Sequence, residues 1–221
     1  MTNFIQNAIV IGANGLVGQH LVKQLNLLPE CEKITVVLRK PCAALESLEK
    51  VQSLILEDFL LLNDEDVSGY SHAFSCLGTT LKKAGSQQAF YAVDYSMNVH
   101  FAELLQAKGT HYLLVSALGA DANSKLFYNR VKGELEQYIE MLDLDKVSIL
   151  RPSLLLGERH EQRRLEGLGQ KLYHKISHFI PQHFQYKPVT AKQVAHTMVE
   201  AAQSQIHKYQ IYDNLQIQKT K

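Results

Sequence analysis

Short apolar runs rich in β-branched residues alternate along the chain with longer segments in which apolar residues recur at helical spacing. Such runs, when turn residues bound them, are typical of strands that are buried on both faces. The runs predict strands at residues 8–11, 33–39, 51–56, 71–76, 111–116 and 147–150, and residues 210–213 are a candidate for a seventh strand.

The segments between these runs predict helices, the clearest of which cover residues 16–28, 86–108 and 124–141. A further helix begins after Thr190, where Thr190 and Gln193 have the spacing of a capping box. Strands that alternate with helices predict an α/β fold. We expect a doubly wound, mainly parallel sheet (Rossmann-like) of about six or seven strands, with helices on both faces.

No linker, internal repeat or low-complexity tract interrupts this pattern, so residues 1–221 are predicted to form a single domain. In sheets of this class, ligands bind at the carboxyl ends of the strands. Residues from about 152 to 190 follow one of these ends and are expected to shape a substrate cleft. Arg159 and Arg163 share a face of a charged helix predicted there, and they are either ligands for an anionic substrate or part of a solvated surface.

A glycine-rich turn joins the first predicted strand to the first helix. Gly12 lets the chain turn off the strand, Gly15 leaves no Cβ between the backbone and a pyrophosphate, and Gly18 lets the helix lie close to the sheet. The helix N-terminus offers N–H groups to that pyrophosphate. A turn without a ligand is the alternative, but the strand–turn–helix context favours a dinucleotide. The residues predicted to bind it here are Gly12, Asn14, Gly15, Leu16, Val17 and Gly18.

Basic residues follow the second predicted strand, where this class of fold distinguishes its cofactors. An acidic residue at this point would bind the ribose 2′-hydroxyl and repel a 2′-phosphate. The chain has Arg39 and Lys40 instead. Because a guanidinium grips phosphate through paired hydrogen bonds, NADP(H) is predicted over NAD(H). A solvated basic pair is the alternative interpretation.

A serine, a tyrosine and a lysine lie at the end of the fifth predicted strand and on the helix that follows it. Ser116 ends that strand, and Tyr128 and Lys132 stand four residues apart on the next helix, so they share one face. A phenol has an ordinary pKa of about 10, and a nearby ammonium lowers it. A fall to about 7 needs about 4 kcal/mol, which a desolvated cleft with one cation and a cationic nicotinamide is expected to supply. Tyr128 would then exchange a proton with a carbonyl oxygen that Ser116 holds.

These residues together resemble the short-chain dehydrogenase/reductases, and most closely their atypical members of Tat-interacting-protein oxidoreductase type. The resemblance covers residues 8 to about 157, with weaker similarity beyond, and includes Cys76–Leu77–Gly78, Val93–Asp94 and Arg151–Pro152. It implies a Rossmann fold, NADPH binding and a Ser–Tyr–Lys site. Asn98 is either the helix asparagine usual in the family or an ordinary helix residue. Further cofactor contacts are expected at Cys76, Leu77, Gly78, Lys132, Pro152 and Leu154.

The leading functional hypothesis is therefore an NADPH-dependent oxidoreductase that reduces a small carbonyl compound. A regulatory or redox-sensing protein that binds NADPH is the alternative, because atypical members of the family include such regulators. An NAD-dependent sugar-nucleotide epimerase is a further alternative. Arg39 and the absence of the long C-terminal substrate domain of the sugar-nucleotide enzymes argue against it.

Composition adds constraints on partners and compartment. The chain is 46% hydrophobic and 20% charged, with a net charge of +1, which gives no general attraction to nucleic acid or to anionic membranes. Three cysteines without metal-type spacing indicate reduced thiols, and the histidines show no metal-ligand pattern. No signal peptide or long apolar window is visible. The expectation is a cytoplasmic protein with a small-molecule substrate and no metal, nucleic acid or membrane partner. Its oligomeric state stays open.

Overall fold

The computed structural model of the chain describes residues 4–156 and 184–220. Its main feature is a parallel sheet of seven strands in the order β3-β2-β1-β4-β5-β6-β9. The strands are β1 (Asn7–Ile11), β2 (Lys33–Leu38), β3 (Val51–Ile55), β4 (His72–Ser75), β5 (His111–Val115), β6 (Lys146–Leu150) and β9 (Tyr209–Tyr212). The predicted fold class is confirmed, and all seven predicted strands are present.

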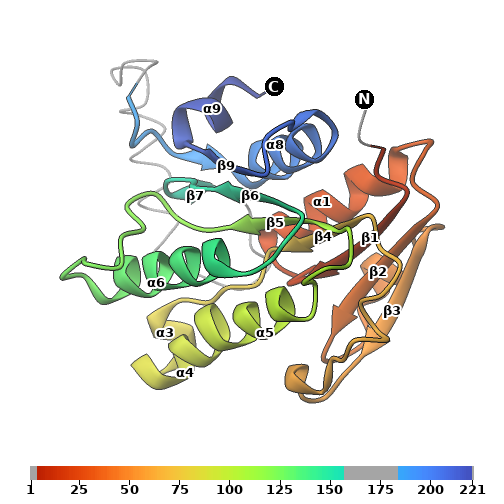
Figure 1. Cartoon of the computed structure of the whole chain (residues 1–221), viewed down its shortest axis with the longest axis horizontal. Coiled ribbons are helices and arrows are strands. Elements are labelled where there is room, and N and C mark those ends of the chain that lie inside the picture. Colours follow the sequence, from red (N-terminus) through yellow and green to blue (C-terminus); the bar gives the residue numbers. More distant parts are fainter. Residues whose placement is uncertain (1–3, 157–183, 221) are drawn as a thin grey trace.

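Helices cover both faces of the sheet (Figure 1). One face carries α1 (Leu16–Leu27) and α8 (Ala191–Ser204), and the other carries α5 (Met97–Glu103) and α6 (Phe127–Met141). The shorter elements are α2 (Ala43–Glu46), η1 (Phe59–Leu61), α3 (Leu81–Ala84), α4 (Gln87–Tyr91), the π-helix η2 (Ala92–Ser96) and α9 (Asn214–Lys219). A separate pair of short strands, β7 (Leu155–Leu156) and β8 (Val189–Thr190), lies beside the main sheet.

The apolar runs of the sequence form strands because each run has to fill two cores. In β1, Ala8 and Val10 point into the core beneath α1 and α8, whereas Ile9 and Ile11 point into the core beneath α5 and α6. Neighbouring side chains of a strand lie on opposite faces of the sheet. A strand with both faces covered is therefore apolar without interruption.

Several helices and short strands differ from the prediction, and the short elements α2, η1 and α3 were not predicted. Residues 86–108, predicted as one helix, consist of α4, the π-helix η2 and α5, and the last of these ends at Glu103. The short helix α9 and the β7–β8 pair were not predicted. The charged helix predicted after Gly157, with Arg159 and Arg163, lies outside the described residues.

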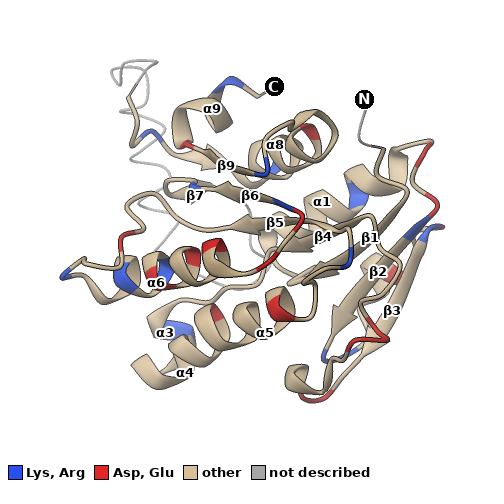
Figure 2. Cartoon of the chain, in the orientation of Figure 1, with Lys and Arg blue, Asp and Glu red and all other residues tan. Residues whose placement is uncertain are grey.

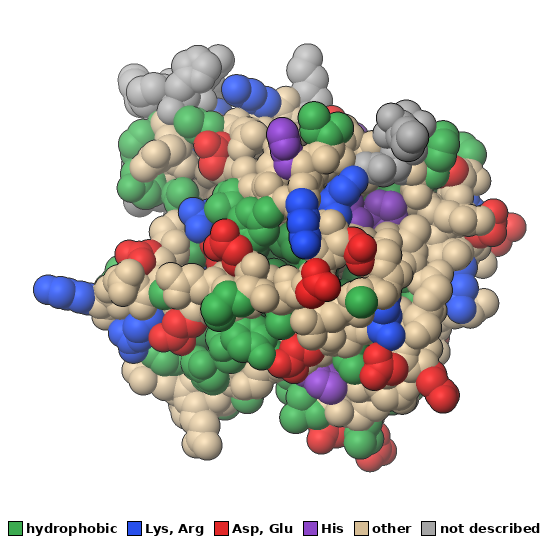
Figure 3. Space-filling model, viewed as in Figure 1, with side chains coloured by type: hydrophobic (Ala, Val, Ile, Leu, Met, Phe, Trp, Pro, Cys, Tyr) green, Lys and Arg blue, Asp and Glu red, His purple; other side chains and the backbone are tan. Residues whose placement is uncertain are grey.

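Aromatic side chains fill the seam between the π-helix and α6. Tyr91 and Tyr95 stack with ring centroids 4.6 Å apart, and Tyr95 meets the edge of Tyr138 at 6.2 Å. Figure 3 shows hydrophobic side chains gathered at the surface where α5 and α6 meet. The seam holds the π-helix against α6, which brings two segments distant in sequence together.

Two histidines are buried at the amino ends of β4 and β5. His72 is 3% exposed, His111 is 4% exposed, and their ring centroids lie 5.4 Å apart. His72 Nε2 lies 3.3 Å from the carbonyl oxygen of Ala202, and His111 Nε2 lies 2.7 Å from Ser148 Oγ. Burial, with smaller contributions from neighbouring groups that include Lys146, lowers the pKa of His72 to about 4 and that of His111 to about 2. Both rings are therefore neutral at neutral pH.

We expect acid to destabilise the protein through these histidines. Below the ordinary histidine pKa of 6.5 the unfolded chain binds a proton at His72, whereas the folded chain does not until the pH approaches 4. For His72 alone, the free energy of unfolding should fall by about 3 kcal/mol between pH 6.5 and pH 4. Urea unfolding at neutral and acidic pH measures this loss. His72→Gln should show a weaker pH dependence than the exposed control His207→Gln, and equal dependence in the two would contradict the assignment.

Candidate active site

The carboxyl ends of the central strands converge on a cradle of backbone atoms. Gly12, at the end of β1, has a φ of +71°, and a Cβ there would lie 2.5 Å from the carbonyl of Cys76 and the nitrogen of Leu77. A Cβ on Gly18 would lie 2.3 Å from the carbonyl oxygen of Gly12. Positions 12 and 18 therefore exclude any side chain, since both bring backbone against backbone. The structure brings together the glycine loop and the loop after β4.

The N-terminus of α1 is free of side-chain capping. Gly15 is the N-cap residue, and no side chain there accepts a hydrogen bond from the first turn. No acidic residue occupies that turn either. The N–H groups of the first turn, which includes Leu16, Val17 and Gly18, and the positive end of the helix dipole thus remain for an anion. This arrangement fits the pyrophosphate of a dinucleotide.

The loop after β4 contributes backbone rather than side chains to this cradle. The thiol of Cys76 is directed away, with its sulfur 3.8 Å from the sulfur of Met198 on α8. Burial raises the pKa of this thiol to about 12. Leu77 packs against the core beneath α5 and α6. Contacts of these two residues with a cofactor, which remain predictions, therefore concern their main-chain atoms.

Lys132 is held in a buried ion pair. Its ammonium lies 2.8 Å from the carboxylate of Asp94, and the two side chains are 4% and 1% exposed. The other oxygen of Asp94 accepts a hydrogen bond of 2.8 Å from the N–H of Thr79. A Cβ on Gly78 would lie 3.2 Å from Asp94 and 3.8 Å from the Lys132 nitrogen. Burial lowers the pKa of Lys132, but Asp94 and Tyr128 raise it and the net change is a rise, so Lys132 is charged at neutral pH.

Tyr128 precedes Lys132 by four residues on α6, so the two share a face, as the spacing predicts. It packs beside Phe90, with ring centroids 5.7 Å apart. Although 38% of Tyr128 is exposed, desolvation by the surrounding protein raises the pKa of its phenol. Lys132 lowers that pKa and Asp94 raises it again. The net change from the protein's own groups is a rise, so the phenol is protonated at neutral pH. Burial and Lys132 alone do not produce the fall to about 7, for which the prediction also counted on a cationic nicotinamide.

Ser116 is buried and engaged with α6. Its hydroxyl donates to Glu136, which also accepts a hydrogen bond of 3.0 Å from Nε of Arg151. Ser116 and Glu136 are each 4% exposed. Its hydroxyl is thus engaged with a carboxylate, and its role toward a substrate oxygen remains a prediction.

Asn98, in the first turn of α5, has a structural role at the junction with the π-helix. It is fully buried, accepts a hydrogen bond from Ser75, and donates to the carbonyls of Val93 and Asp94 at 3.0 and 3.3 Å. These carbonyls belong to the π-helix, whose wider turn changes the usual hydrogen-bond ladder. Asn98 therefore supports the segment that carries Asp94.

Sequence reasoning missed the role of Asp94, as well as the Glu136–Arg151 pair. Asp94 was named from the sequence only as part of the Val93–Asp94 segment, which carries the family resemblance, and no role was given to it. Glu136 had a local signal, because it stands four residues after Lys132 and so lies on the same helix face. Its partner Arg151 follows β6 and is joined to it only by the fold.

The remaining predicted residues lie at the carboxyl edge of the sheet. Arg39 and Lys40 follow β2 and are exposed, as is Asn14 in the glycine loop. Pro152 is buried after β6 and accepts a hydrogen bond of 2.8 Å from Leu118. Leu154 is 69% exposed. The roles of these residues toward a cofactor stay predictions.

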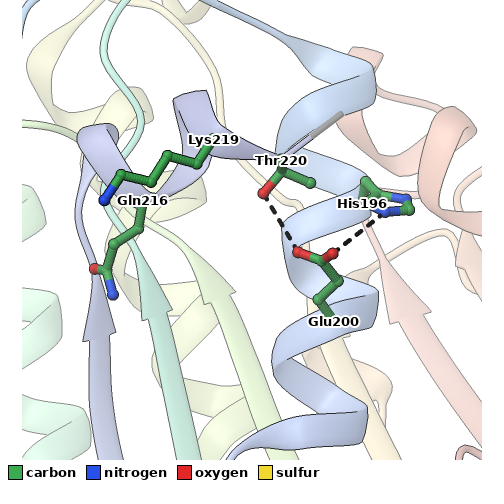
Figure 4. A pocket seen from close by; sticks show the side chains of 5 residues that line it. All are labelled: His196, Glu200, Gln216, Lys219 and Thr220. Atoms are coloured by element: carbon green, nitrogen blue, oxygen red, sulfur yellow. Dashed lines mark hydrogen bonds and ion pairs between the residues drawn. The ribbon is translucent and has the colours of Figure 1, made fainter. Parts of the chain in front are cut away.

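A separate cavity of about 380 Å³ lies between α8 and α9. Figure 4 shows His196 and Glu200 on one side and Gln216 and Lys219 on the other. None of its lining residues belongs to the predicted site. In the described ranges, no cluster of histidine, cysteine, aspartate and glutamate has the arrangement of a metal site.

Two relatives are similar to the chain over most of its length. No family model matches it. "Protein FMP52-1, mitochondrial" of Scheffersomyces stipitis is 34% identical over 207 residues, which cover 91% of this chain and 90% of the relative. "Protein HTATIP2" of Rattus norvegicus is 34% identical over 171 residues, or 74% and 70% of the two chains. The chain belongs to the FMP52/HTATIP2 family. The resemblance to the Tat-interacting-protein type of atypical short-chain dehydrogenase/reductase is thereby confirmed.

Solved structures share the fold of this FMP52/HTATIP2 family member. A short-chain dehydrogenase/reductase from Burkholderia thailandensis superposes with a TM-score of 0.69 at 16% identity, covering 96% of this chain and 92% of that one. The enzyme WbmF of Bordetella bronchiseptica, solved with NAD⁺, gives a TM-score of 0.65 at 15% identity, with coverages of 98% and 77%. At this level of identity the likeness concerns the fold alone.

The expectation of a cytoplasmic location is wrong. The fungal relatives from Scheffersomyces stipitis, Debaryomyces hansenii and Candida albicans are all named as mitochondrial proteins. Reduced thiols and a near-zero net charge do not distinguish the cytosol from other reducing compartments, so composition could not decide this point. Figure 2 shows acidic and basic residues interspersed over the fold, as the small net charge implies. Across residues 4–156 and 184–220, no helix has the length and apolar character needed to span a bilayer.

Proposed function

We propose that this protein is an NADPH-dependent oxidoreductase that reduces a small carbonyl substrate by Ser–Tyr–Lys chemistry. The observation that carries the proposal is the buried, charged Lys132 one helical turn from the partly exposed Tyr128, beside the Gly78 loop. The uncapped N-terminus of α1 and the glycine cradle support a dinucleotide cofactor. The binding of NAD⁺ and NADH by the structural neighbour WbmF supports the same class of cofactor.

The roles of the residues follow from their charge and protonation. A bound reduced nicotinamide would supply a hydride to the carbonyl carbon. Tyr128 would donate its phenolic proton to the carbonyl oxygen, and Lys132 would stabilise the phenolate left behind. Ser116 would hold the substrate oxygen by exchanging its bond to Glu136 for one to the substrate. A proton from solvent would then restore Tyr128. The raised pKa of Tyr128 suits a proton donor at neutral pH and therefore favours the reductive direction.

The choice between NADPH and NADH is assigned to Arg39. Its exposed side chain follows β2, where a guanidinium can reach a 2′-phosphate. We expect Arg39→Ala to weaken NADPH binding by about 10- to 100-fold, the value of one or two charge-assisted hydrogen bonds, and to leave NADH binding nearly unchanged. Fluorescence titration with both cofactors measures this, with Lys23→Ala on the exposed face of α1 as the control. Tighter binding of NADH than NADPH by the native chain would refute the assignment.

Turnover is tested by a screen of aldehydes and ketones in which the loss of NADPH absorbance is followed. A second candidate is a protein that binds NADPH and regulates a partner. The observation that favours it is Ser116, which is 4% exposed and bonded to Glu136 rather than open to a substrate oxygen. Tight NADPH binding without turnover of any carbonyl compound would favour this regulator. Turnover that depends on Tyr128 would favour the reductase.

A further inference from the structure

Asp94 connects the two parts of the candidate site. One carboxylate oxygen binds the Lys132 ammonium and the other binds the N–H of Thr79, each at 2.8 Å. Lys132 belongs to α6 and Thr79 to the loop that follows β4, next to the glycine cradle. A carboxylate bridging two such segments fixes the position of one relative to the other.

The surroundings of Asp94 are built to hold it there. It lies in the π-helix, which Asn98 supports from within and which the tyrosine seam holds against α6. Asp94 is 1% exposed, so its charge is separated from water and its pairing with Lys132 is unscreened. A buried charge of this kind is tolerated only with a partner and with hydrogen bonds to its remaining lone pairs.

We propose that Asp94 is a positioning residue of the active site, which fixes the Lys132 ammonium relative to the Gly78–Thr79 loop and partly neutralises the charge that faces Tyr128. The inference rests on the proposed function, because Asp94 matters for catalysis only if Tyr128 donates a proton to a substrate. The charged and titratable groups that act on Lys132 are Asp94 from the π-helix and Tyr128 and Glu136 from α6. Glu136 is itself paired with Arg151, so Asp94 is the main counter-charge.

This arrangement has a consequence for proton transfer. Burial is the largest cause that keeps the phenol of Tyr128 protonated at neutral pH. Asp94 adds to it, because with Asp94 present the phenol faces an ion pair rather than an isolated cation. Without the carboxylate, Tyr128 would face an unpaired ammonium, which stabilises the phenolate. Asp94 thus adapts the site to proton donation.

The test is a spectroscopic titration of Tyr128 that needs no substrate. Phenolate absorbance is recorded against pH for the native chain and Tyr128→Phe, and the difference between the two isolates Tyr128. The same pair is measured in an Asp94→Asn background, where the amide can still accept from Thr79 but carries no charge. We expect the midpoint of Tyr128 to fall by about one to two pH units in that background. An unchanged or raised midpoint would overturn the proposal.

Three further variants make the test specific. Asp94→Glu restores the charge and should bring the midpoint back towards the native value, which a purely structural role would not require. Glu134→Gln removes a carboxylate of α6 that lies near Arg130, and it should leave Tyr128 unmoved. If Asp94→Asn does not fold, Gly78→Ala is the substitute, because its methyl group, in an exposed loop, would push the Asp94 carboxylate aside. The midpoint of Tyr128 should then fall by a smaller amount. An unchanged midpoint would again refute the proposal.

The outcome separates this inference from the proposed function. The titration requires neither cofactor nor turnover, so a midpoint shift stands even if the substrate screen finds no reductase activity. Conversely, Tyr128-dependent turnover with an unmoved midpoint leaves the reductase in place and removes only the role of Asp94.

Discussion

Tyr128→Phe should reduce the rate of carbonyl reduction by about 10²- to 10⁴-fold, the usual contribution of a positioned general acid. The substitution removes only the hydroxyl and keeps the ring that packs beside Phe90. The affinity for NADPH should therefore stay nearly the same. Rates are measured by the loss of NADPH absorbance, and affinity by titration of NADPH fluorescence.

The pH dependence of the native rate provides a second measurement of the same role. Because the pKa of Tyr128 is raised, kcat/KM for reduction should stay level through neutral pH and fall only above the ordinary tyrosine value of about 10. Tyr138→Phe is the matched control, since Tyr138 lies on the same helix and its hydroxyl binds Glu103. Turnover by Tyr128→Phe at the rate of this control would refute the assigned role.

Gly12→Ala should destabilise the protein by about 2 to 5 kcal/mol and abolish measurable NADPH binding. Two costs add in this estimate, about 1 to 2 kcal/mol for a side chain at positive φ and about 1 to 3 kcal/mol for overpacking. The second arises because the new methyl group would lie 2.5 Å from the backbone of Cys76 and Leu77. The chain has no tryptophan, so unfolding in urea is best followed by circular dichroism.

Gly69→Ala isolates the contribution of the close approach. Gly69 has a φ of +80°, similar to the +71° of Gly12, but a Cβ there would have no atom within 4 Å. The Gly69→Ala variant should therefore lose only the cost of positive φ, about 1 to 2 kcal/mol, from its free energy of unfolding. It should bind NADPH normally. If the two substitutions destabilise the protein equally, the close approach of the two loops does not contribute to the loss of stability in Gly12→Ala.

Features that depend on neighbours along the chain were predictable from the sequence. The strands were identified because each run must be apolar on both faces, and the glycine loop because it lies between a strand and a helix. Tyr128 and Lys132 were placed on one face by helical spacing alone. The π-helix was missed because one wider turn leaves the apolar pattern of residues 86–108 compatible with an ordinary helix.

Features that depend on partners distant in sequence were decided by the tertiary structure. Lys132 was recognised, but its counter-charge Asp94 comes from the other side of the site. Burial, with a smaller contribution from Asp94, raises the pKa of Tyr128 although Lys132 lowers it. Ser116 was likewise recognised without Glu136 and Arg151. The sequence by itself determined the fold class and the residue types at the ends of the strands. Packing alone decided which charges are buried together, because that depends on how the helices sit on the sheet and on how much water they exclude.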